Sequence, residues 1–495
     1  MKGEGPVTPE KKEKTRSQLE EFCIHAAELG DGILFGLLHE NRFLFNETSG
    51  EWLVYSGHKW ELDLTGEAQK AVEYIAVWYS NRASDLAARI DRGEKDGDKT
   101  KIEQLKAEQR LCNKKAKKLR TQRGRQACLH LAHTNYERPL QVSGDALDLH
   151  PMRLACTDGV IDLETGELRP GRPQDLITLG SPTNWHGLHA SAPNFERTIN
   201  EIVDDPEVSE FLQRFFGYCC TGLVTESALV VLEGQGRNGK TLLVETLAHV
   251  LGPLAGSIPS EMLLDQGRFT NADSPTPSLM SLRGLRCAFA SEVEENRRFS
   301  SSRVKWLSGS DSLVGRFPHD RRPTRFRPTH KLILLINERP NAPMNDYAFW
   351  ERLHMVPFPF SFVDHEPKAA NERRADKSLA EKLKEEAPGI LAWLVRGCLK
   401  WQKQGLSPPE KIRKNTEEYK RSEDLLETFL DEHCILDPKE EEASADLYDA
   451  FKSWWSENVS RKTLSQKKFG RLMGRKFERK KTNTIKYVGL RLVKI

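Results

Sequence analysis

The chain has 495 residues and carries 75 Lys and Arg against 72 Asp and Glu, a formal net charge of +3. This length is enough for about two to four domains with separate cores, and so small a net charge favours no class of partner by itself. The nine cysteines include no C-x-x-C pair. Neither a disulfide framework nor a zinc ribbon is therefore indicated, and a reducing compartment fits best. Cys128, His130 and His133 form a loose group without a fourth ligand, so we expect ordinary helix side chains there.

Residues 1–30 are predicted to form a polar tail, because they are charged and lack the apolar segment of a signal peptide. No later apolar run is long enough to span a membrane. We therefore expect a soluble protein that is not exported by that route and has no membrane partner.

Residues 31–190 are predicted to form a mixed α/β region. Apolar and polar residues alternate over 34–63, which indicates a small meander of strands. Helical periodicity follows from about 67 to 131 and is broken by the polar stretch 92–101. Short strands separated by glycine-containing turns return over 153–170.

Residues 191–365 alternate helices with apolar strands, which is typical of an α/β nucleotide-binding core. Strands of this kind, which are continuous apolar runs, fit a parallel sheet covered on both faces. A charge-rich helical connector is predicted over 366–422 and a compact basic unit over 423–495. The apolar runs are 228–234, 285–292, 331–337 and 353–358.

The stretch "GQGRNGKT" matches the phosphate-loop pattern G-x-x-x-x-G-K-[ST], and it lies between an apolar strand and a segment with helical spacing. Glycines let the backbone N–H groups point at phosphates, while the lysine reaches the β- and γ-phosphates and the threonine hydroxyl ligates Mg²⁺. We expect ATP and Mg²⁺ as cofactors. The predicted nucleotide-binding residues are Gly234, Gln235, Gly236, Arg237, Asn238, Gly239, Lys240 and Thr241.

Two later strand ends carry the polar groups that a phosphate loop requires. Glu292 follows the run 285–290 and is predicted to act with Thr241 on Mg²⁺ and on the attacking water, with Glu294 as a weaker candidate. Asn337 ends the next run, where an amide can orient that water. The alternatives are a surface acid after a strand and a turn-forming asparagine. Lys240, Glu292 and Asn337 are thus candidate catalytic residues.

Basic residues gather at the C-terminus, where thirteen Lys and Arg follow residue 460 against the single acid Glu478. A concentration of this kind favours a polyanion as partner. An amphipathic helix is predicted over 465–477, and its basic face, available for DNA phosphates, consists of Lys467, Lys468, Arg471 and Arg475. A second basic run, 113–126, is predicted to be an exposed helix. For that helix a solvated face is at least as good an interpretation as a nucleic-acid contact.

The order of the phosphate loop, the acidic strand end, "VKWLSGSDSLVGRF" and the polar strand end resembles the superfamily 3 AAA+ helicases. It is most similar to the phage and plasmid primase-helicase family, which includes the poxvirus primase-helicase. The family segment K-x-L-x-G-G-D-x-x-x-x-R corresponds here to residues 305–316, with Ser310 in place of the second glycine. The lead-in "LACTDGVIDLETGELRP" and the segments around 445–458 and 465–492 are similar as well, so the resemblance covers about residues 30–495.

The resemblance implies an N-terminal collar over 31–190, an AAA+ motor over 191–365 and a C-terminal winged helix over 423–495. It also implies a homo-oligomeric ring, most simply a hexamer, in which Arg352 of one subunit completes the neighbour's ATP site. A β-hairpin between Arg316 and Pro328 would line the pore and contact single-stranded DNA. The pore residues near its tip would be His319, Arg321 and Arg322.

The predicted function is that of an ATP-dependent DNA helicase acting on single-stranded and forked DNA in phage, plasmid or mobile-element replication, in a bacterial host cytoplasm. The primase that often accompanies this motor is not expected, because the one D-x-D, at 96–98, lies in a polar turn. A separate primase would then be a partner. Two alternatives remain: a DNA-dependent AAA+ switch or loader without processive unwinding, and a metabolic phosphate-loop kinase.

Overall fold

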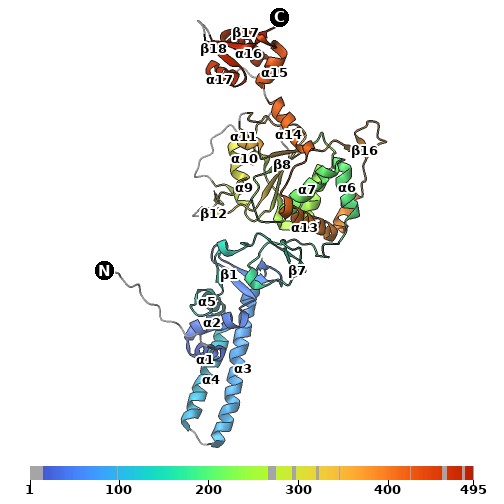
Figure 1. The fold of residues 1–495 in the computed structure, drawn as a ribbon. Coiled ribbons are helices and arrows are strands. Elements are labelled where there is room, and N and C mark those ends of the chain that lie inside the picture. Colours follow the sequence, from blue (N-terminus) through green and yellow to red (C-terminus); the bar gives the residue numbers. More distant parts are fainter. Residues whose placement is uncertain are drawn as a thin grey trace, which may run out of the picture.

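The computed structural model describes residues 15–493 with gaps at 97–98, 266–274, 292–296, 319–322, 345, 424, 460–464 and 482–484. Along the chain, an N-terminal region with a long helical hairpin is followed by a central α/β domain and then by a C-terminal α/β module (Figure 1). The architecture is mixed α/β, as the sequence predicts.

The N-terminal region is built on five helices that share one core. Part of the predicted polar tail is in fact structured, because α1 buries Cys23 and Ile24 in that core. The strand expected from residue 34 was also wrong at its start, since Ile33, Leu34 and Phe35 are all buried within a helix. Three consecutive buried residues are possible in a helix that other elements enclose, whereas a half-exposed strand would have alternating buried and exposed residues. The helices are α1 (Arg16–His25), α2 (Ala27–His39), α3 (Glu67–Asp96), α4 (Lys99–Leu119) and α5 (Gln122–Thr134).

A buried ammonium group fixes this helical core. Lys115 Nζ on α4 donates to Asp31 Oδ1 at 2.9 Å, to the Cys23 carbonyl at 2.8 Å and to the Ala27 carbonyl at 2.6 Å. Burial raises the pKa of Asp31, and the Lys115 charge opposes that shift. Because the ammonium has acceptors on two other helices, it sets the packing of α4 against α1 and α2.

Two small sheets complete the N-terminal region, as the alternating pattern predicts. The first has the order β3-β2-β1-β4, and the second joins β5, β6 and β7 in antiparallel pairs. The strands of the first sheet are β1 (Phe43–Asn46), β2 (Glu51–Tyr55), β3 (Trp60–Leu62) and β4 (Gln141–Val142); those of the second are β5 (Arg153–Cys156), β6 (Gly159–Asp162) and β7 (Leu168–Arg169).

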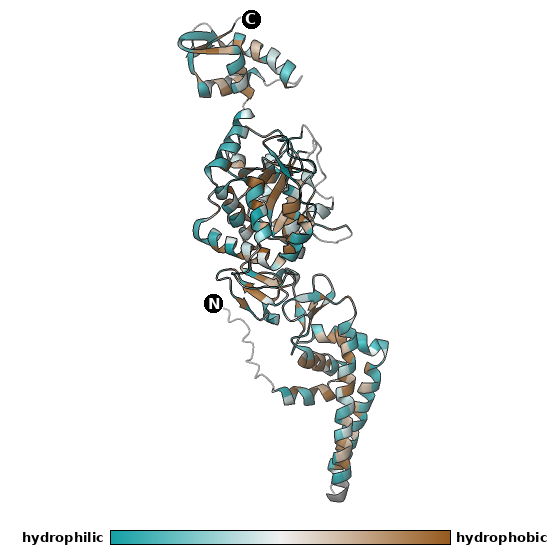
Figure 2. Ribbon diagram, turned by 90° about the vertical axis from the view of Figure 1, so that its right-hand side faces the viewer, coloured by the Kyte–Doolittle hydropathy of each residue, from teal (hydrophilic) through white to brown (hydrophobic). Residues whose placement is uncertain are grey.

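The central domain contains a five-stranded parallel sheet in the order β14-β8-β13-β10-β9. Its strands are the apolar segments that are brown in Figure 2. The four predicted strands are present, whereas the short β9 was not predicted because three residues give no readable period. The strands are β8 (Leu229–Glu233), β9 (Ala255–Ser257), β10 (Cys287–Ala290), β13 (Lys331–Ile336) and β14 (Leu353–Pro357).

Helices cover both faces of this sheet. Alternate residues of β8 point to opposite cores, with Val230 and Leu232 on one side and Leu229 and Val231 on the other. The first core includes α6 (Pro193–Val203), α7 (Pro206–Tyr218) and α8 (Lys240–Leu251). The second includes residues of α9 (Pro277–Met280), α10 (Ser301–Leu307) and α11 (Tyr347–Trp350).

The segment 366–422, expected as a connector, instead belongs to this domain. Most of its α13 is buried in the same core as α7 and α8, with Ile390, Leu391 and Leu394 inaccessible. The reason is that α13 contains more apolar residues than a solvated linker helix would. The segment follows β15 (Ser361–Val363) and contains β16 (Glu372–Arg374), α12 (Leu379–Glu385), α13 (Ala387–Gln404) and α14 (Glu410–Ser422).

The C-terminal module has a three-stranded antiparallel sheet in the order β17-β19-β18, packed against three helices. The predicted apolar face of the last helix is confirmed, because Phe469, Leu472 and Met473 are buried. The elements are α15 (Leu425–His433), β17 (Cys434–Ala443), α16 (Ser444–Asn458), α17 (Gln466–Lys476), β18 (Glu478–Lys481) and β19 (Ile485–Leu492).

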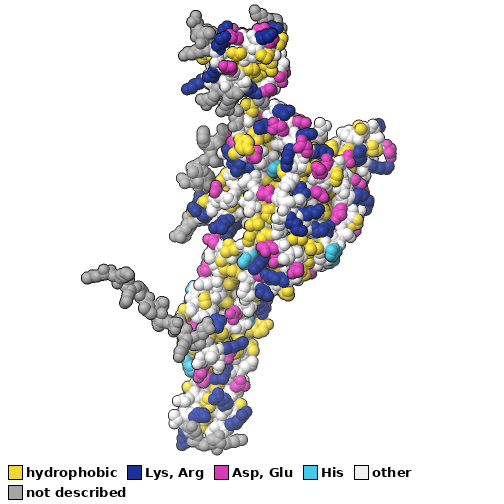
Figure 3. Space-filling view, in the orientation of Figure 1, with side chains coloured by type: hydrophobic (Ala, Val, Ile, Leu, Met, Phe, Trp, Pro, Cys, Tyr) yellow, Lys and Arg dark blue, Asp and Glu magenta, His cyan; other side chains and the backbone are white. Residues whose placement is uncertain are grey.

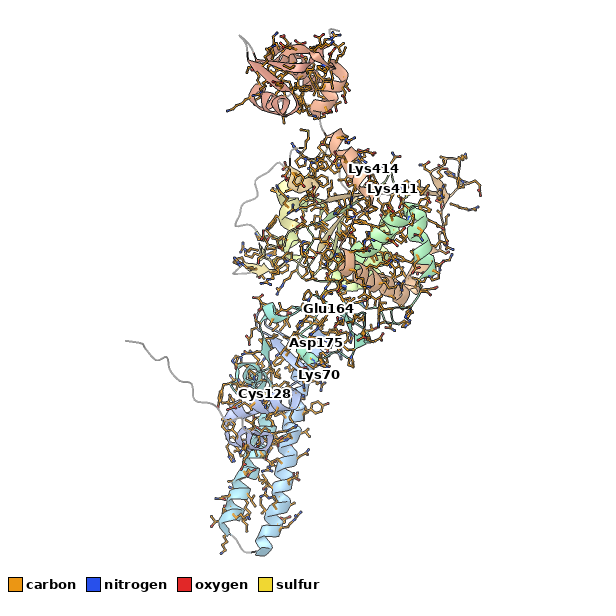
Figure 4. The ribbon with its side chains drawn as sticks, in the orientation of Figure 1. Lys70, Cys128, Glu164, Asp175, Lys411 and Lys414 are labelled. Carbon is orange, nitrogen blue, oxygen red and sulfur yellow. The ribbon has the colours of Figure 1, made fainter. Side chains whose placement is uncertain are left out.

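All nine cysteines are free thiols in buried positions. Cys128, labelled in Figure 4, donates to the Asp31 carbonyl, while His133 Nδ1 lies 2.8 Å from Glu47 Oε1. These partners account for the two side chains as packing and hydrogen-bonding groups. Across the described ranges, no helix is both long and apolar enough to cross a bilayer.

Candidate nucleotide-binding site

The glycine-rich loop joins the interior strand β8 to the first turn of α8. Gly236, Arg237 and Gly239 have φ values of +101°, +49° and +81°. Successive left-handed residues turn neighbouring N–H groups toward one side of the chain, which forms a concave anion site. The site lies at the helix N-terminus, where the dipole also favours negative charge. Thr241, in the first turn, is exposed there.

Lys240 is buried at the base of this loop, and its ammonium group donates hydrogen bonds to three oxygen acceptors. Nζ donates to the Gly234 carbonyl at 2.5 Å, to Asn238 Oδ1 at 3.0 Å and to Asn337 Oδ1 at 3.1 Å. Burial lowers the pKa of Lys240 to about 8, and the nearby Glu233 carboxylate acts in the opposite direction. The lysine is therefore held at the loop by polar groups and is readily deprotonated above that pH.

Asn238 ties the loop to the segment that follows β14. Its amide Nδ2 donates to the carbonyls of Phe358 at 3.3 Å and Phe360 at 2.8 Å, while its Oδ1 accepts from Lys240. The backbone N–H of Phe362 donates to the Arg237 carbonyl at 2.8 Å. The loop therefore has little freedom to collapse, which is a form of preorganisation for a ligand.

An ion pair that the sequence did not predict lies beneath the loop. Arg339 binds Glu233, the last residue of β8, through Nε to Oε1 at 2.5 Å and Nη2 to Oε2 at 2.9 Å. Asn415 on α14 contacts both partners: its Nδ2 donates to Glu233 at 3.1 Å, and its Oδ1 accepts from Arg339 at 2.8 Å. The Arg339 guanidinium also lies 5.3 Å from the ring centroid of Tyr419. We call these four residues the Glu233 cluster.

The Glu233 cluster connects the loop to the helix that leads to the C-terminal module. Tyr419 of α14 donates its hydroxyl hydrogen to the Pro340 carbonyl, and Glu423 accepts from the Ala342 N–H at 2.7 Å. Burial raises the pKa of Glu423. The strand-end segment that carries Asn337 is therefore fastened to α14. The only sequence signal for the cluster was a charged residue, Glu233, at the end of an otherwise apolar strand.

The structure places Asn337 directly beside Lys240, although 97 residues separate them. This juxtaposition arises because β8 and β13 are parallel neighbours, so their carboxyl ends lie at one edge of the sheet. Glu292 and Glu294 lie outside the described residues. Their strand, β10, pairs in parallel with β13 and ends at Ala290.

Arg352 lies at the opposite edge of the sheet from the loop. Its carbonyl accepts from the N–H of Leu229, the first residue of β8, at 2.7 Å. The two ends of that strand are about 13 Å apart at 3.3 Å per residue. The guanidinium Nη1 donates to the Ala348 carbonyl at 2.6 Å, and its Nε has no hydrogen bond to any residue in the described ranges. Arg352 is therefore not part of its own chain's phosphate site.

An antiparallel pair of strands lies at the predicted hairpin, but it begins earlier than predicted. The strand β11 (Leu313–Gly315) directly precedes the predicted range, and its partner β12 (Thr324–Phe326) lies within it. His319, Arg321 and Arg322, at the predicted tip, lie outside the described residues.

In the C-terminal module Lys467 is exposed on α17, whereas the side chains of Lys468, Arg471 and Arg475 are outside the described set. Asp96 of the D-x-D ends α3 and is not on a strand.

The chain is similar to a family model and to several known viral proteins. Residues 34–204 match the family model described as D5 N terminal like. The chain is 25% identical over 455 residues to "Putative helicase L207/L206" of Acanthamoeba polyphaga mimivirus, covering 87% of this chain and 46% of that protein. These matches support a relationship of the chain to the phage and viral primase-helicase family.

Other viral relatives show the same partial overlap. The chain is 23% identical over 331 residues to "Putative primase C962R" of African swine fever virus, covering 63% of this chain and 34% of that protein. The apo structure of the NrS-1 C terminal region (305–718) is 11% identical with a TM-score of 0.46, covering 91% of this chain and 96% of that chain. The chain thus spans less than half the length of these viral proteins.

Proposed function

We propose that the chain is an ATP-driven DNA helicase motor that works as a homo-oligomeric ring, most simply a hexamer. The observation that carries the proposal is the approach of Asn337 to Lys240 at the carboxyl edge of a parallel sheet. A phosphate-loop lysine beside a strand-end amide is an arrangement that can bind a triphosphate and orient a water for attack on it. The similarity to viral proteins named as putative helicases also supports a helicase function.

The residues present fit ATP and Mg²⁺. Lys240 and the loop N–H groups would hold the phosphates, Thr241 and Glu292 would hold the metal ion, and Asn337 would orient the water. Bound Mg²⁺ supplies charge neutralisation between the phosphates. The ammonium of Lys240 would exchange its contacts with Asn238 and Asn337 for phosphate oxygens, which leaves the Asn337 amide available.

The opposite placement of Arg352 supports a site shared between subunits. An arginine at the amino edge of β8 cannot reach its own loop, but it can reach the loop of a neighbour in a ring. ATP hydrolysis at such interfaces would move the β11–β12 hairpin along single-stranded DNA. The hairpin residues His319, Arg321 and Arg322 and the α17 residues Lys467, Lys468, Arg471 and Arg475 are the proposed DNA contacts.

The element order α15-β17-α16-α17-β18-β19 supports a winged-helix module for the C-terminal unit. In such a module α17 would lie along duplex DNA and the β18–β19 turn would form the wing. The activity would serve replication of a phage, plasmid or mobile element, with forked DNA as substrate.

The decisive experiment compares strand displacement on a forked substrate for the wild type and Lys240→Ala. Wild-type protein should hydrolyse ATP in a DNA-stimulated manner and displace a strand. The variant should retain its fold by circular dichroism and lose both activities by at least 100-fold. Unwinding without ATP, or activity undiminished in the variant, would refute the motor. DNA-stimulated hydrolysis without strand displacement would instead select a loader, and hydrolysis indifferent to DNA would select a small-molecule kinase.

A further inference from the structure

A 28-residue segment of the N-terminal region, 109–136, contains eight Lys and Arg and no Asp or Glu. The segment covers the second half of α4 and all of α5. The structure divides its basic residues into two groups according to whether acidic side chains neutralise them. That division is not visible in the sequence, where all eight look equivalent.

Four members of the segment are paired within the protein. Lys115 is buried against Asp31 at 2.9 Å, Lys118 pairs with Glu28, and Arg120 pairs with Glu73 at 2.9 Å. Arg125 also faces Glu73, at 3.5 Å. The charges of these four residues are therefore largely used in holding α4 and α5 to α1, α2 and α3.

Arg110, Lys114, Lys117 and Arg123 differ from them. All four are exposed, and none forms an ion pair with another residue in the described ranges. Arg123 lies on α5. The other three are spaced by four and three residues, which puts them on one face of α4 over about 10 Å. That face is opposite to the buried one, which carries Cys112, Ala116 and Leu119. We call Arg110, Lys114 and Lys117 the α4 stripe.

The α4 stripe slightly destabilises the helix, and no acidic side chain among the described residues pairs with it to offset this. Like charges at i,i+3 and i,i+4 on a helix repel each other, whereas an acid at one of these positions would add support. Figure 3 shows Lys and Arg side chains on the surface of the helical hairpin and of the C-terminal module. A row of like charges kept together on a solvent face fits an external polyanion better than an internal structural role.

The chemistry of the face favours nucleic acid over an acidic protein. Among the described residues, no large hydrophobic side chain is strongly exposed between Val77 and Tyr136. Protein interfaces need an apolar or aromatic centre, whereas phosphate contacts need only cations at the spacing of a backbone. Adjacent phosphates of one strand are about 3.4 Å apart along a duplex, so a 10 Å row can face about three of them.

We propose that the α4 stripe binds the phosphate backbone of DNA, as a second contact separate from the motor and the C-terminal module. The proposal rests on the proposed function for the identity of the polyanion. It predicts binding that is independent of base sequence and sensitive to salt, because only phosphates are contacted. The three side chains would act as a guide for the duplex or for the displaced strand beside the N-terminal region.

The test uses the full chain with the triple variant Arg110→Gln, Lys114→Gln and Lys117→Gln. Fluorescence anisotropy with a labelled fork is measured from 50 to 200 mM salt. The slope of log affinity against log salt should decrease by about 2 to 3, since each lost contact removes about 0.7 to 0.9. Affinity at the lowest salt should fall at least tenfold. Melting should be unchanged or slightly higher, because the three side chains have no partner to lose.

The matched control is the double variant Lys118→Gln and Arg120→Gln, which removes two basic residues that are already paired, one in the last turn of α4 and one directly after it. It should change the salt slope by less than 0.5. An equal effect of the control, or an unchanged slope in the triple variant, would overturn the proposal and leave the face to solvent or to an acidic protein. If the wild type does not bind the fork at all, the proposed function fails instead, so the two failures are distinguishable.

Discussion

The Glu233 cluster provides a quantitative prediction for Arg339→Ala. In the wild type, the bidentate ion pair compensates the Glu233 carboxylate, which directly precedes the phosphate loop. Removing Arg339 leaves that carboxylate with only Asn415 as a donor among the described residues. Its charge would then repel a triphosphate and attract the Lys240 ammonium.

The size of the effect follows from the exposure of the pair. The side chains of Arg339 and Glu233 are 29% and 19% exposed, so the pair lies between a surface and a buried ion pair. Loss of a hydrogen-bonded partner of this kind costs about 2 kcal/mol of folding stability. A unit charge acting over about 8 to 10 Å at an effective dielectric constant of about 20 is worth roughly 2 kcal/mol before screening. After screening by salt, we expect the KM for ATP to rise about tenfold with a smaller change in kcat.

The assay is steady-state ATP hydrolysis with the double variant Arg339→Ala, Glu233→Gln as the critical comparison. If uncompensated charge causes the defect, the double variant should regain a KM within about threefold of the wild type while staying destabilised. The matched control is Arg374→Ala, which breaks an ion pair with Glu366 whose side chains are 71% and 80% exposed and should change neither quantity. An unchanged KM in Arg339→Ala, or no recovery in the double variant, would refute the reasoning.

Three further predictions concern the same molecule. Mixing Arg352→Ala with Lys240→Ala protein should restore part of the ATPase activity that each lacks alone, because a mixed ring contains some interfaces with both residues; no recovery in verified mixed rings would remove the support for a shared site. The affinity for a fluorescent ATP analogue should fall by up to tenfold per pH unit above pH 8, with proton uptake on binding seen by calorimetry in two buffers, because the pKa of Lys240 is about 8 and phosphates bind its ammonium form. A flat affinity from pH 7 to 9 would contradict this. Burial lowers the pKa of His330 from 6.5 to about 4, so the folded state binds fewer protons than the unfolded state and stability should fall between pH 6.5 and 4 by about 3 kcal/mol from this residue. Chemical denaturation of His330→Phe should show a shallower acid loss than the wild type or the exposed-site control His365→Asn.

The local features of this protein could be predicted from its sequence. The glycine-rich loop requires particular backbone conformations, so Gly236 and Gly239 identify it without reference to the rest of the chain. The apolar runs of β8, β10, β13 and β14 identified four of the five central strands, because a doubly covered parallel strand must be apolar throughout. The apolar face of α17 was readable for the same local reason, since Phe469, Leu472 and Met473 recur at helical spacing.

The tertiary structure alone decided which of these features act together. Lys240 contacts Asn337 although 97 residues separate them, and Glu233 contacts Arg339 and Asn415 at separations of 106 and 182 residues. These contacts form because parallel strand pairing and helix packing bring the strand ends and α14 to one edge of the sheet. The same holds for the basic segment 109–136. The number of charges can be read from the sequence, but whether a basic residue forms an ion pair depends on which side chain of another helix lies opposite it. Composition therefore predicted a basic helix, and only the packing of α1, α2 and α3 separated the neutralised Lys115, Lys118 and Arg120 from the α4 stripe.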